Sequence, residues 1–221
     1  MLGVPGAIVN DPNTAGGFDG KNDRVDMGDP ADESLDFGAQ DFSVEAWVKA
    51  TPTGERAIIS KRAYSNSPRP FWQVLVTDDA GQTGRIRVNY GDGTITREVY
   101  GPAVRVDDGA WHHVVVLFDR DTGIIVYVDG TNVRTNLVGI TGSVSNSGAL
   151  NIGKSAGYNN FAGNLDEVAI YAGLLSPERI AAHHQAGTGQ LGPIQPSGLL
   201  ARLVGGELDI SAESPWRALS P

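Results

Sequence analysis

The sequence of 221 residues contains no cysteine at all. A disulfide framework, a thiolate zinc site, an iron–sulfur cluster and a cysteine nucleophile are therefore excluded. Basic residues are also scarce, because 17 Lys and Arg stand against 26 Asp and Glu, which gives a formal net charge of −9. A protein that binds duplex nucleic acid needs a surplus of Lys and Arg to displace counterions from phosphates, so we expect no nucleic-acid partner.

Long apolar segments are missing too. No stretch approaches the roughly 18 uninterrupted apolar residues of a membrane-spanning helix. The start of the chain, MLGVPGAIVNDP, has no basic residue ahead of its few apolar ones, so it is not expected to act as a signal peptide. We expect no membrane insertion. Glycine, in contrast, is plentiful at 29 residues, and charged residues make up only 19%; this composition is typical of a turn-rich globular β protein.

Short runs rich in β-branched and aromatic residues recur along the chain, separated by Gly, Asp, Asn and Pro. In the run 42–48, alternation places Val44 on one face and Glu45 on the other. Residues that tolerate positive φ follow two of the runs, at 91–93 and 129–130, as tight hairpins require. About ten short strands with frequent turns predict two stacked antiparallel sheets. The strands are expected at 42–48, 57–61, 71–76, 85–90, 94–99, 112–118, 124–128, 149–152 and 164–171.

One helix is predicted, over 176–184. Ser176 is a good N-cap and Pro177 suits the first helical position. Gly187 provides a stop signal soon after the last helical residue. The end of the strand-rich region is therefore expected to be a short helix.

All four histidines occur as adjacent pairs, at 112–113 and 183–184. On a helix, neighbouring side chains point about 100° apart, so His183 and His184 cannot chelate one ion by themselves. We interpret that pair as solvated surface residues. On a strand, His112 and His113 point to opposite faces, so at most one of them faces any ligand. The sequence predicts packing roles for this first pair rather than catalysis or metal binding.

The composition changes at residue 187. The stretch 188–198 is rich in Gly, Pro, Gln and Ser and is typical of a linker. Beyond it, apolar residues flank Gly205 and Gly206 and predict a small hairpin within a C-terminal tail at 199–221. A lone hairpin is marginal in water, so the tail has to dock on the domain formed by 1–187 or on a neighbouring chain. The candidate assembly residues of the tail are Leu199, Leu200, Leu203, Val204, Leu208, Ile210 and Trp216.

Several motifs follow one another in a familiar order: GFDG (17–20), FSVEAWVKA (42–50), DDGAWHHVVVLFDRDTGIIVYVDG (107–130), LNIGK (150–154) and FAGNLDEVAIYAGLLSPERI (161–180). Together they resemble a laminin-G-like domain of the concanavalin A-like lectin/glucanase superfamily, of the kind found in bacteriophage tail and surface proteins. The resemblance covers about residues 17–187. It implies an all-β, two-sheet antiparallel jelly-roll sandwich with one short C-terminal helix, to which the sequence adds a tail hairpin. Few residues precede the first motif, so the first strand is expected to be short or to begin within 7–10.

The resemblance also implies a structural Ca²⁺ on the edge of the sandwich. The matching positions are Asp19 in GFDG and Asp166 in NLDEV, with Asp23 as a looser match. Calcium takes six to eight oxygen ligands, which carboxylates and loop carbonyls can provide. The alternative, that Asp19 is an Asx-turn residue and Asp166 only ends a strand, stays open. Glu167 is expected to be solvated.

Catalysis is not expected. Retaining β-glucanases of the resembled superfamily carry Glu-x-Asp-x-Glu, or a version with one more residue, on a single strand. The nearest pattern in this chain is Glu207, Asp209 and Glu213, which is one residue too long even for the longer version. Six residues of strand span about 20 Å, whereas a retaining pair needs its carboxyl groups about 5–5.5 Å apart. We therefore predict a protein that is not an enzyme.

Two polar loops with aromatic residues, at 64–70 and 157–161, are the candidate ligand sites. Aromatic faces stack on the CH groups of sugars and amides bind hydroxyls, and loops on a rigid scaffold commonly carry binding residues. The alternative, that these are ordinary turns with one aromatic side chain packed inward, remains open. The candidate ligand-binding residues are Tyr64, Asn66, Arg69, Tyr158, Asn159 and Asn160.

The opening 2–20 resembles the segment that leads into laminin-G-like modules of phages that infect actinobacteria. Arg outnumbers Lys by 13 to 4, which indicates a GC-rich genome, and the absence of cysteine fits synthesis in a bacterial cytosol. We predict a non-catalytic virion surface protein, a head decoration or tail component, with a glycan-binding-type domain directed at host-surface glycans. Its tail is expected to bind other virion or cell-surface proteins and to form a homo-oligomer, with a trimer as the working hypothesis. The alternative is a lectin domain of a secreted adhesin at the bacterial cell surface.

Overall fold

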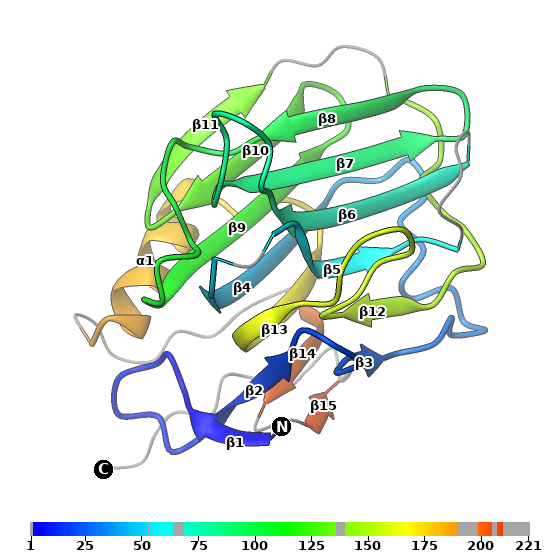
Figure 1. Ribbon diagram of the computed structural model, residues 1–221. Coiled ribbons are helices and arrows are strands. Elements are labelled where there is room, and N and C mark those ends of the chain that lie inside the picture. Colours follow the sequence, from blue (N-terminus) through cyan, green and yellow to red (C-terminus); the bar gives the residue numbers. More distant parts are fainter. Residues whose placement is uncertain are drawn as a thin grey trace.

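The computed structural model describes residues 2–52, 54–63, 69–135, 140–189, 199–204 and 207–209. Two antiparallel sheets stack face to face, and a short helix packs against one of them (Figure 1). This arrangement confirms the predicted all-β jelly-roll sandwich. No helix in the described part of the chain is long and apolar enough to cross a membrane.

The larger sheet contains the long central strands of the sandwich. Its strands run in the order β1 (Leu2–Pro5), β2 (Thr14–Asp19), β13 (Ala162–Ala172), β4 (Phe42–Ala50), β9 (His112–Asp119), β10 (Gly123–Val128) and β11 (Thr131–Thr135). The smaller sheet runs in the order β3 (Val25–Asp26), β12 (Leu150–Ile152), β5 (Arg56–Lys61), β6 (Pro70–Val76), β7 (Ile86–Asp92) and β8 (Thr96–Tyr100).

The core lies between the two sheets and is built from alternate residues of their strands. The ring of Phe42 is stacked between those of Phe37 and Phe118, with centroids 4.3 and 4.1 Å apart. Trp72 from the smaller sheet meets the same ring at 5.3 Å. Each of these fully buried side chains contributes about 1.5–3 kcal/mol by leaving water. The aromatic cluster therefore joins the two layers.

All nine runs predicted as strands from the sequence are strands, with ends that shift by at most two residues. The hairpin between β10 and β11 turns at Asp129 and Gly130, whose φ angles of 49° and 77° are the positive values that the turn needs. The first strand was expected to be short or to begin within 7–10, and it is short: β1 has four residues and pairs with β2, whereas residues 7–10 form no strand. β2 has the sequence TAGGFD, a poor strand former, and its pairing with β13 rather than its own propensity holds it extended.

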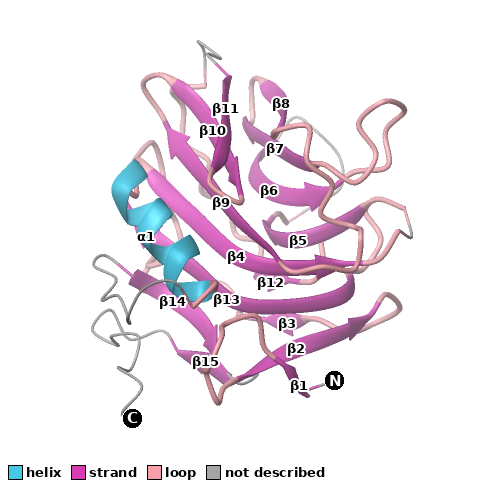
Figure 2. Ribbon diagram, turned by 90° about the vertical axis from the view of Figure 1, so that its left-hand side faces the viewer, coloured by secondary structure: helices cyan, strands magenta, loops and turns pink. Residues whose placement is uncertain are grey.

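The helix α1 (Pro177–Gly187) begins where it was predicted and ends three residues later. The side chain of Ser176 accepts a hydrogen bond from the backbone N–H of Arg179 at 3.2 Å, which confirms the N-cap. A Cβ at Gly187 would lie 2.1 Å from the ring of Trp47, so only glycine lets the end of α1 approach this closely. α1 covers part of the outer face of the larger sheet (Figure 2).

The tail hairpin consists of β14 (Leu199–Val204) and β15 (Glu207–Asp209), as predicted. β14 pairs with residues 169–171 of β13, while β2 pairs with residues 162–165 of the same strand. One edge of β13 is therefore shared by the first and last parts of the chain. Leu199, Leu200, Leu203 and Val204 lie on β14 and Leu208 on β15, whereas Ile210, Trp216 and most of the expected linker, at 190–198, lie outside the described residues.

Candidate ligand-binding face

The outer face of the smaller sheet is polar, although its inner face belongs to the core. Strand alternation directs Val74 and Val88 inward, and Gln73, Arg87 and Asn89 outward. The three polar side chains are nevertheless nearly buried. A loop covers part of this face, because Ser155 and Tyr158 contact these side chains.

That loop is the segment between β12 and β13, and it places Tyr158 over the sheet. The Tyr158 hydroxyl accepts hydrogen bonds from Nη2 of Arg87 at 3.3 Å and from Nδ2 of Asn89 at 3.2 Å. The guanidinium carbon of Arg62 lies 4.5 Å from the ring centroid of Phe71 and 5.7 Å from that of Tyr158. Both separations are within the range of cation–π contacts. The predicted ligand residue Tyr158 thus faces the sheet's outer side rather than the core.

A hollow of about 370 Å³ opens beside Arg62, just after β5, and is lined also by residues of β3 and β12. We call it the basic hollow, because Arg24, Arg62 and Lys154 line it together with a single carboxylate among the described residues, Asp26. Hydroxyl and amide groups line it as well, beside Gly148 and three alanines. These polar groups come from Ser147, Asn151 and Ser155.

A smaller hollow of about 160 Å³ adjoins the basic hollow and shares Ala63 and Ser147 with it. Arg69, which the sequence predicts as a ligand residue, lines this smaller hollow beside Phe71. Tyr64 and Asn66, the other predicted residues of that loop, lie outside the described residues. Their role stays a prediction.

The other two predicted ligand residues hold the covering loop in place. The backbone carbonyl of Asn159 accepts a hydrogen bond from the N–H of Ala57 at 3.4 Å. The backbone carbonyl of Asn160 accepts one from Nη1 of Arg56 at 3.1 Å, and its side-chain amide donates to the carbonyl of Lys21. These bonds hold the loop, whereas Tyr158 contacts Arg87 and Asn89 on the sheet; none of the three loop residues lines the hollow of about 370 Å³.

At the β7–β8 end of the face, the buried guanidinium of Arg87 is matched by carboxylates. Nη1 lies 2.7 Å from Oδ2 of Asp79 and 3.6 Å from Oε2 of Glu98, and Nη2 contacts Glu55. Burial acts to lower the pKa of Arg87, but these carboxylates outweigh it and raise that pKa. Positive charge is therefore cancelled at this end of the face.

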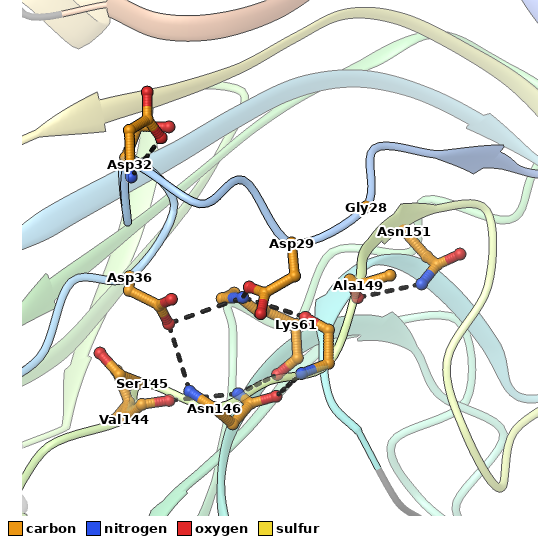
Figure 3. Close-up of polar contacts among 12 residues, drawn as sticks. Gly28, Asp29, Asp32, Asp36, Lys61, Val144, Ser145, Asn146, Ala149 and Asn151 are labelled. Atoms are coloured by element: carbon orange, nitrogen blue, oxygen red, sulfur yellow. Dashed lines mark hydrogen bonds and ion pairs between the residues drawn. The ribbon is translucent and has the colours of Figure 1, made fainter.

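A second buried cation, Lys61, lies among Asp29, Asp36 and Asn146 (Figure 3). Its Nζ lies 2.5 Å from Oδ1 of Asp29 and 3.5 Å from Oδ1 of Asp36, and it donates to the carbonyl of Gly148 at 2.9 Å. Asn146 donates from its backbone to Asp36 at 3.2 Å and from its side chain to the carbonyl of Lys61 at 3.2 Å. These bonds fix the segment 144–149. Sequence reasoning missed this network, although the acidic run 29–36 ahead of the first long strand was a visible sign of it.

The segment Gly153–Gly157 has the Gly-x-Ser-x-Gly spacing of a nucleophile elbow. Ser155 is nonetheless buried, and its Oγ donates a hydrogen bond to Oε1 of Gln73 at 2.6 Å. All four histidines of the chain lie on or beside the larger sheet, at β9 and α1. Ser155 therefore has no histidine base in reach, and its place is in the lining of the basic hollow.

The structure separates the residues expected to bind calcium. Asp19 is paired with Ala162, and Asp166 lies four residues further along β13, about 13 Å away. Oδ1 of Asp19 accepts the backbone N–H of Lys21 at 2.8 Å, as an Asx-turn residue does, whereas Oδ2 of Asp166 accepts that of Ala7 at 2.7 Å. The oxygen ligands of a calcium ion lie within about 2.6 Å of the ion. These two aspartates therefore do not fit a shared site.

Asp23 lies in the same turn as Asp19, and its Oδ2 accepts the backbone N–H of Asp19 at 2.9 Å. Within the described residues, no three acidic or histidine side chains form a group that could hold a metal ion. Calcium binding at this turn stays a prediction. Glu167, which was expected to be solvated, is 1% exposed, because the bulge of β13 turns it inward.

The histidines lie on the opposite side of the sandwich, under α1. Glu45 of β4 is 1% exposed and accepts hydrogen bonds from Nε2 of His113 at 2.6 Å, Nδ1 of His183 at 2.9 Å and the hydroxyl of Tyr171 at 2.7 Å. Burial acts to raise the pKa of Glu45, but the two imidazoles outweigh it and hold that pKa well below its usual range. The expectation of a solvated His183 is therefore wrong; it is buried because α1 carries it onto Glu45. His184, the other half of the pair, is half-buried and its ring lies 6.0 Å from that of Trp47.

His112 points away from His113, as the alternation of a strand predicts. Its Nδ1 lies 2.7 Å from Oδ2 of Asp129 and its Nε2 lies 3.0 Å from Oδ1 of Asp108. The hydrogen bond to Asp129 raises the pKa of His112. The prediction of packing roles for this pair fits both environments.

Comparison with known proteins places these features in a family. A model for laminin-G-like domains, described as the concanavalin A-like lectin/glucanases superfamily, matches residues 19–181. No curated protein matches the sequence. Among solved structures, domain 4 of the GH43 extracellular arabinanase AbnA from Geobacillus stearothermophilus is similar, with a TM-score of 0.59 and 19% identity over 78% of this chain and 77% of that one.

Two further structures share the fold. The CBM40 domain of the Ruminococcus gnavus IT-sialidase has a TM-score of 0.56 and 11% identity over 76% of this chain and 95% of that one. The heptameric SAP-like pentraxin from Limulus polyphemus has a TM-score of 0.53 and 18% identity over 75% and 78%. Identities this low establish a common fold only. From the family match over most of its length, the chain belongs to the concanavalin A-like lectin/glucanases superfamily, as one of its laminin-G-like domains.

Proposed function

We propose that the protein is a non-catalytic glycan-binding module and that the outer face of the smaller sheet, around Tyr158, is its binding site. The observation that carries the proposal is the combination of an aromatic ring, polar strand residues and an adjoining hollow on one face. Sites for small ligands are concave and place a few polar groups beside apolar surface. This face has that composition, whereas α1 covers part of the opposite face of the sandwich.

The polar groups of this face have bonding capacity left over. Nε2 of Gln73 and Oδ1 of Asn89 are buried and have no hydrogen-bond partner among the described residues. A buried polar group without a partner costs about 1–3 kcal/mol, so such groups are usually satisfied by water or by a ligand.

Similar proteins support a carbohydrate ligand. The arabinanase domain was solved in complex with arabinotriose, and the CBM40 domain was solved bound to α2,3-sialyllactose. The position of Ser155 away from every histidine supports a non-catalytic role.

The site can be tested by substituting Tyr158 with alanine and measuring binding on a glycan array. Loss of the ring removes both the stacking surface and the hydroxyl above Arg87 and Asn89, so we expect binding to fall at least tenfold, the loss that a hot-spot aromatic residue causes. The matched control is Leu174→Ala, which removes an exposed side chain beside another hollow of about 300 Å³ at the start of α1. Equal binding by wild type and Tyr158→Ala, or loss in the control instead, would overturn the proposed site.

The finer part of the proposal is that this module is displayed on a phage virion, as a head decoration or tail protein, and is anchored by its C-terminal tail. The pairing of β14 with β13 supports it, because a strand added to a sheet edge is a common recognition mode and the same edge could accept the hairpin of a neighbouring copy. The alternative location is the surface of a bacterial cell.

Light scattering of the full chain and of a variant ending at residue 189 tests the role of the tail. We expect an oligomer that becomes monomeric on truncation. A full chain that stays monomeric at every concentration would contradict assembly through the tail, and would leave β14 as a strand that serves only its own domain.

A further inference from the structure

The basic residues of this acidic protein are not evenly matched with carboxylates. The chain carries only four lysines and thirteen arginines and has a formal net charge of −9. Lys61 and Arg87, both nearly buried, lie within ion-pair distance of two and three carboxylates, respectively. Their positive charges are therefore balanced by carboxylates within the fold.

The basic hollow is different. Lys154 forms no ion pair with a carboxylate among the described residues. Arg24 meets Asp26 only at 3.9 Å, and both of these side chains are about half exposed. The guanidinium of Arg62 rests on the rings of Phe71 and Tyr158 and reaches the amide oxygen of Gln73 at 3.3 Å. Among the described residues that line the hollow, three are cations and one is a carboxylate, so the lining is positive on a molecule whose net charge is negative.

Uncharged donors stand beside these cations. Asn151, on the outer side of β12, and Ser147 line the hollow, and both suit sugar hydroxyls. With a volume of about 370 Å³, the hollow is within the usual range of small-ligand sites, about 300–1,000 Å³. It therefore has the size and the mixed charged and hydroxyl-binding groups that suit one charged sugar unit.

The wall of the hollow is fixed before any ligand arrives. The segment 144–149 is tied to the sheet through Lys61 and Asn146 (Figure 3). Opposite it, the carbonyl of Lys154 accepts a hydrogen bond from Oγ of Ser60 at 2.8 Å, which anchors the start of the covering loop. A rigid wall reduces the ordering that binding would otherwise require.

We infer that the basic hollow binds an acidic sugar, whose carboxylate or sulfate group is held by Lys154, Arg62 and Arg24. This inference rests on the proposed glycan-binding function and adds the class of ligand to it. Arg62 links the two parts of the site, because it lines the hollow and also contacts Tyr158. The acidic group enters the hollow while the rest of the glycan lies along the face toward Tyr158.

A glycan array built in matched pairs tests the inference. Each pair holds an acidic glycan, with a uronic acid, a sialic acid or a sulfated sugar, beside the same glycan without its charged group. We expect binding to the acidic members, at least tenfold above their neutral partners, and weaker binding at high salt. The carboxylated and sulfated pairs show which of the two anionic groups is preferred.

The variant Lys154→Gln removes one charge and keeps a polar side chain that is one atom shorter. We expect it to weaken binding of the acidic glycan about tenfold, the effect of one charge-assisted hydrogen bond, and to leave the melting temperature unchanged. The matched control is Arg97→Gln, which removes one positive charge from β8 at the far edge of the same sheet. Arg24→Gln serves as a second test of the hollow.

The outcomes separate the two proposals. Equal binding of acidic and neutral members would overturn the acidic ligand and leave the glycan-binding function standing. Acidic binding that Lys154→Gln and Arg24→Gln leave unchanged would overturn the basic hollow as its location. No binding anywhere on the array would overturn the proposed function, and this inference with it.

Discussion

The polar side chains on the outer faces of the two sheets are covered differently. On the larger sheet, α1 covers Glu45, His113 and Tyr171, and every one of them takes part in a single buried hydrogen-bonded network. On the smaller sheet, Gln73 and Asn89 are also nearly buried, and one polar atom of each has no partner among the described residues, as is the case for Nδ1 of His113 on the larger sheet. The first face is closed by α1 over one shared carboxylate, whereas the second is open to solvent at the basic hollow.

The largest effect should come from the closed face. Glu45→Ala removes the acceptor shared by His113, His183 and Tyr171, and breaking a buried charged network in this way costs about 3–5 kcal/mol of unfolding free energy. Urea unfolding measures it. Lys154→Gln, on the open face, should change stability by less than about 0.5 kcal/mol. Similar losses for both variants would remove the distinction between the two faces.

The face under α1, which contains Glu45, should also determine how the free energy of unfolding changes in acid. The pKa of Glu45 is held below its usual value of 4.5 by His183 and His113, although burial opposes this. Folding therefore favours the carboxylate, so the stabilisation is present above about pH 4.5 and is lost as the pH falls. His112 acts with the opposite sign: Asp129 raises its pKa, so its contribution is present below about pH 6.5 and is lost as the pH rises.

Unfolding free energies from pH 3 to pH 8 for the wild type and Glu45→Gln check this account. The variant should lose part of the acid-dependent decline, because the group that titrates is gone. Parallel profiles for the two proteins would show that other carboxylates cause the decline.

Lys61→Met tests whether the fold and the open face are connected. The substitution leaves Asp29 and Asp36 without their ammonium partner, but both carboxylates reach solvent, so we expect a loss of about 1–3 kcal/mol. The segment 144–149 also loses an anchor, and glycan binding should weaken. A stable variant with unchanged binding would show that the wall of the basic hollow does not depend on Lys61.

The sequence predicted the sandwich well because its main strands alternate apolar and polar residues. It did not predict β2, whose TAGGFD sequence is extended only because β13 pairs with it. It also placed Tyr158 in a candidate site but missed Arg62 and Lys154, since these two residues are 92 positions apart and no local pattern shows that they line one hollow. His183 was misjudged for the same reason, because its partner Glu45 is 138 residues away.

The smallest effect concerns a single hydroxyl. Tyr158→Phe keeps the ring but removes the acceptor for Arg87 and Asn89, and the loss of such hydrogen bonds costs about 0.5–1.5 kcal/mol. Thermal unfolding measures the change. Because the ring stays, glycan binding should fall less than in Tyr158→Ala. A drop as large as that of the alanine variant would show that the hydroxyl, and not the ring, carries the contact.

The central claim is that ligand binds on the smaller sheet and not beneath α1. Backbone amide shifts in NMR spectra, recorded while the acidic glycan that binds best on the array is added, test it most directly. We predict changes at residues 24–26, 62–63 and 147–158 around the basic hollow and none across 177–187 of α1. Changes that gather on α1 instead would contradict the account.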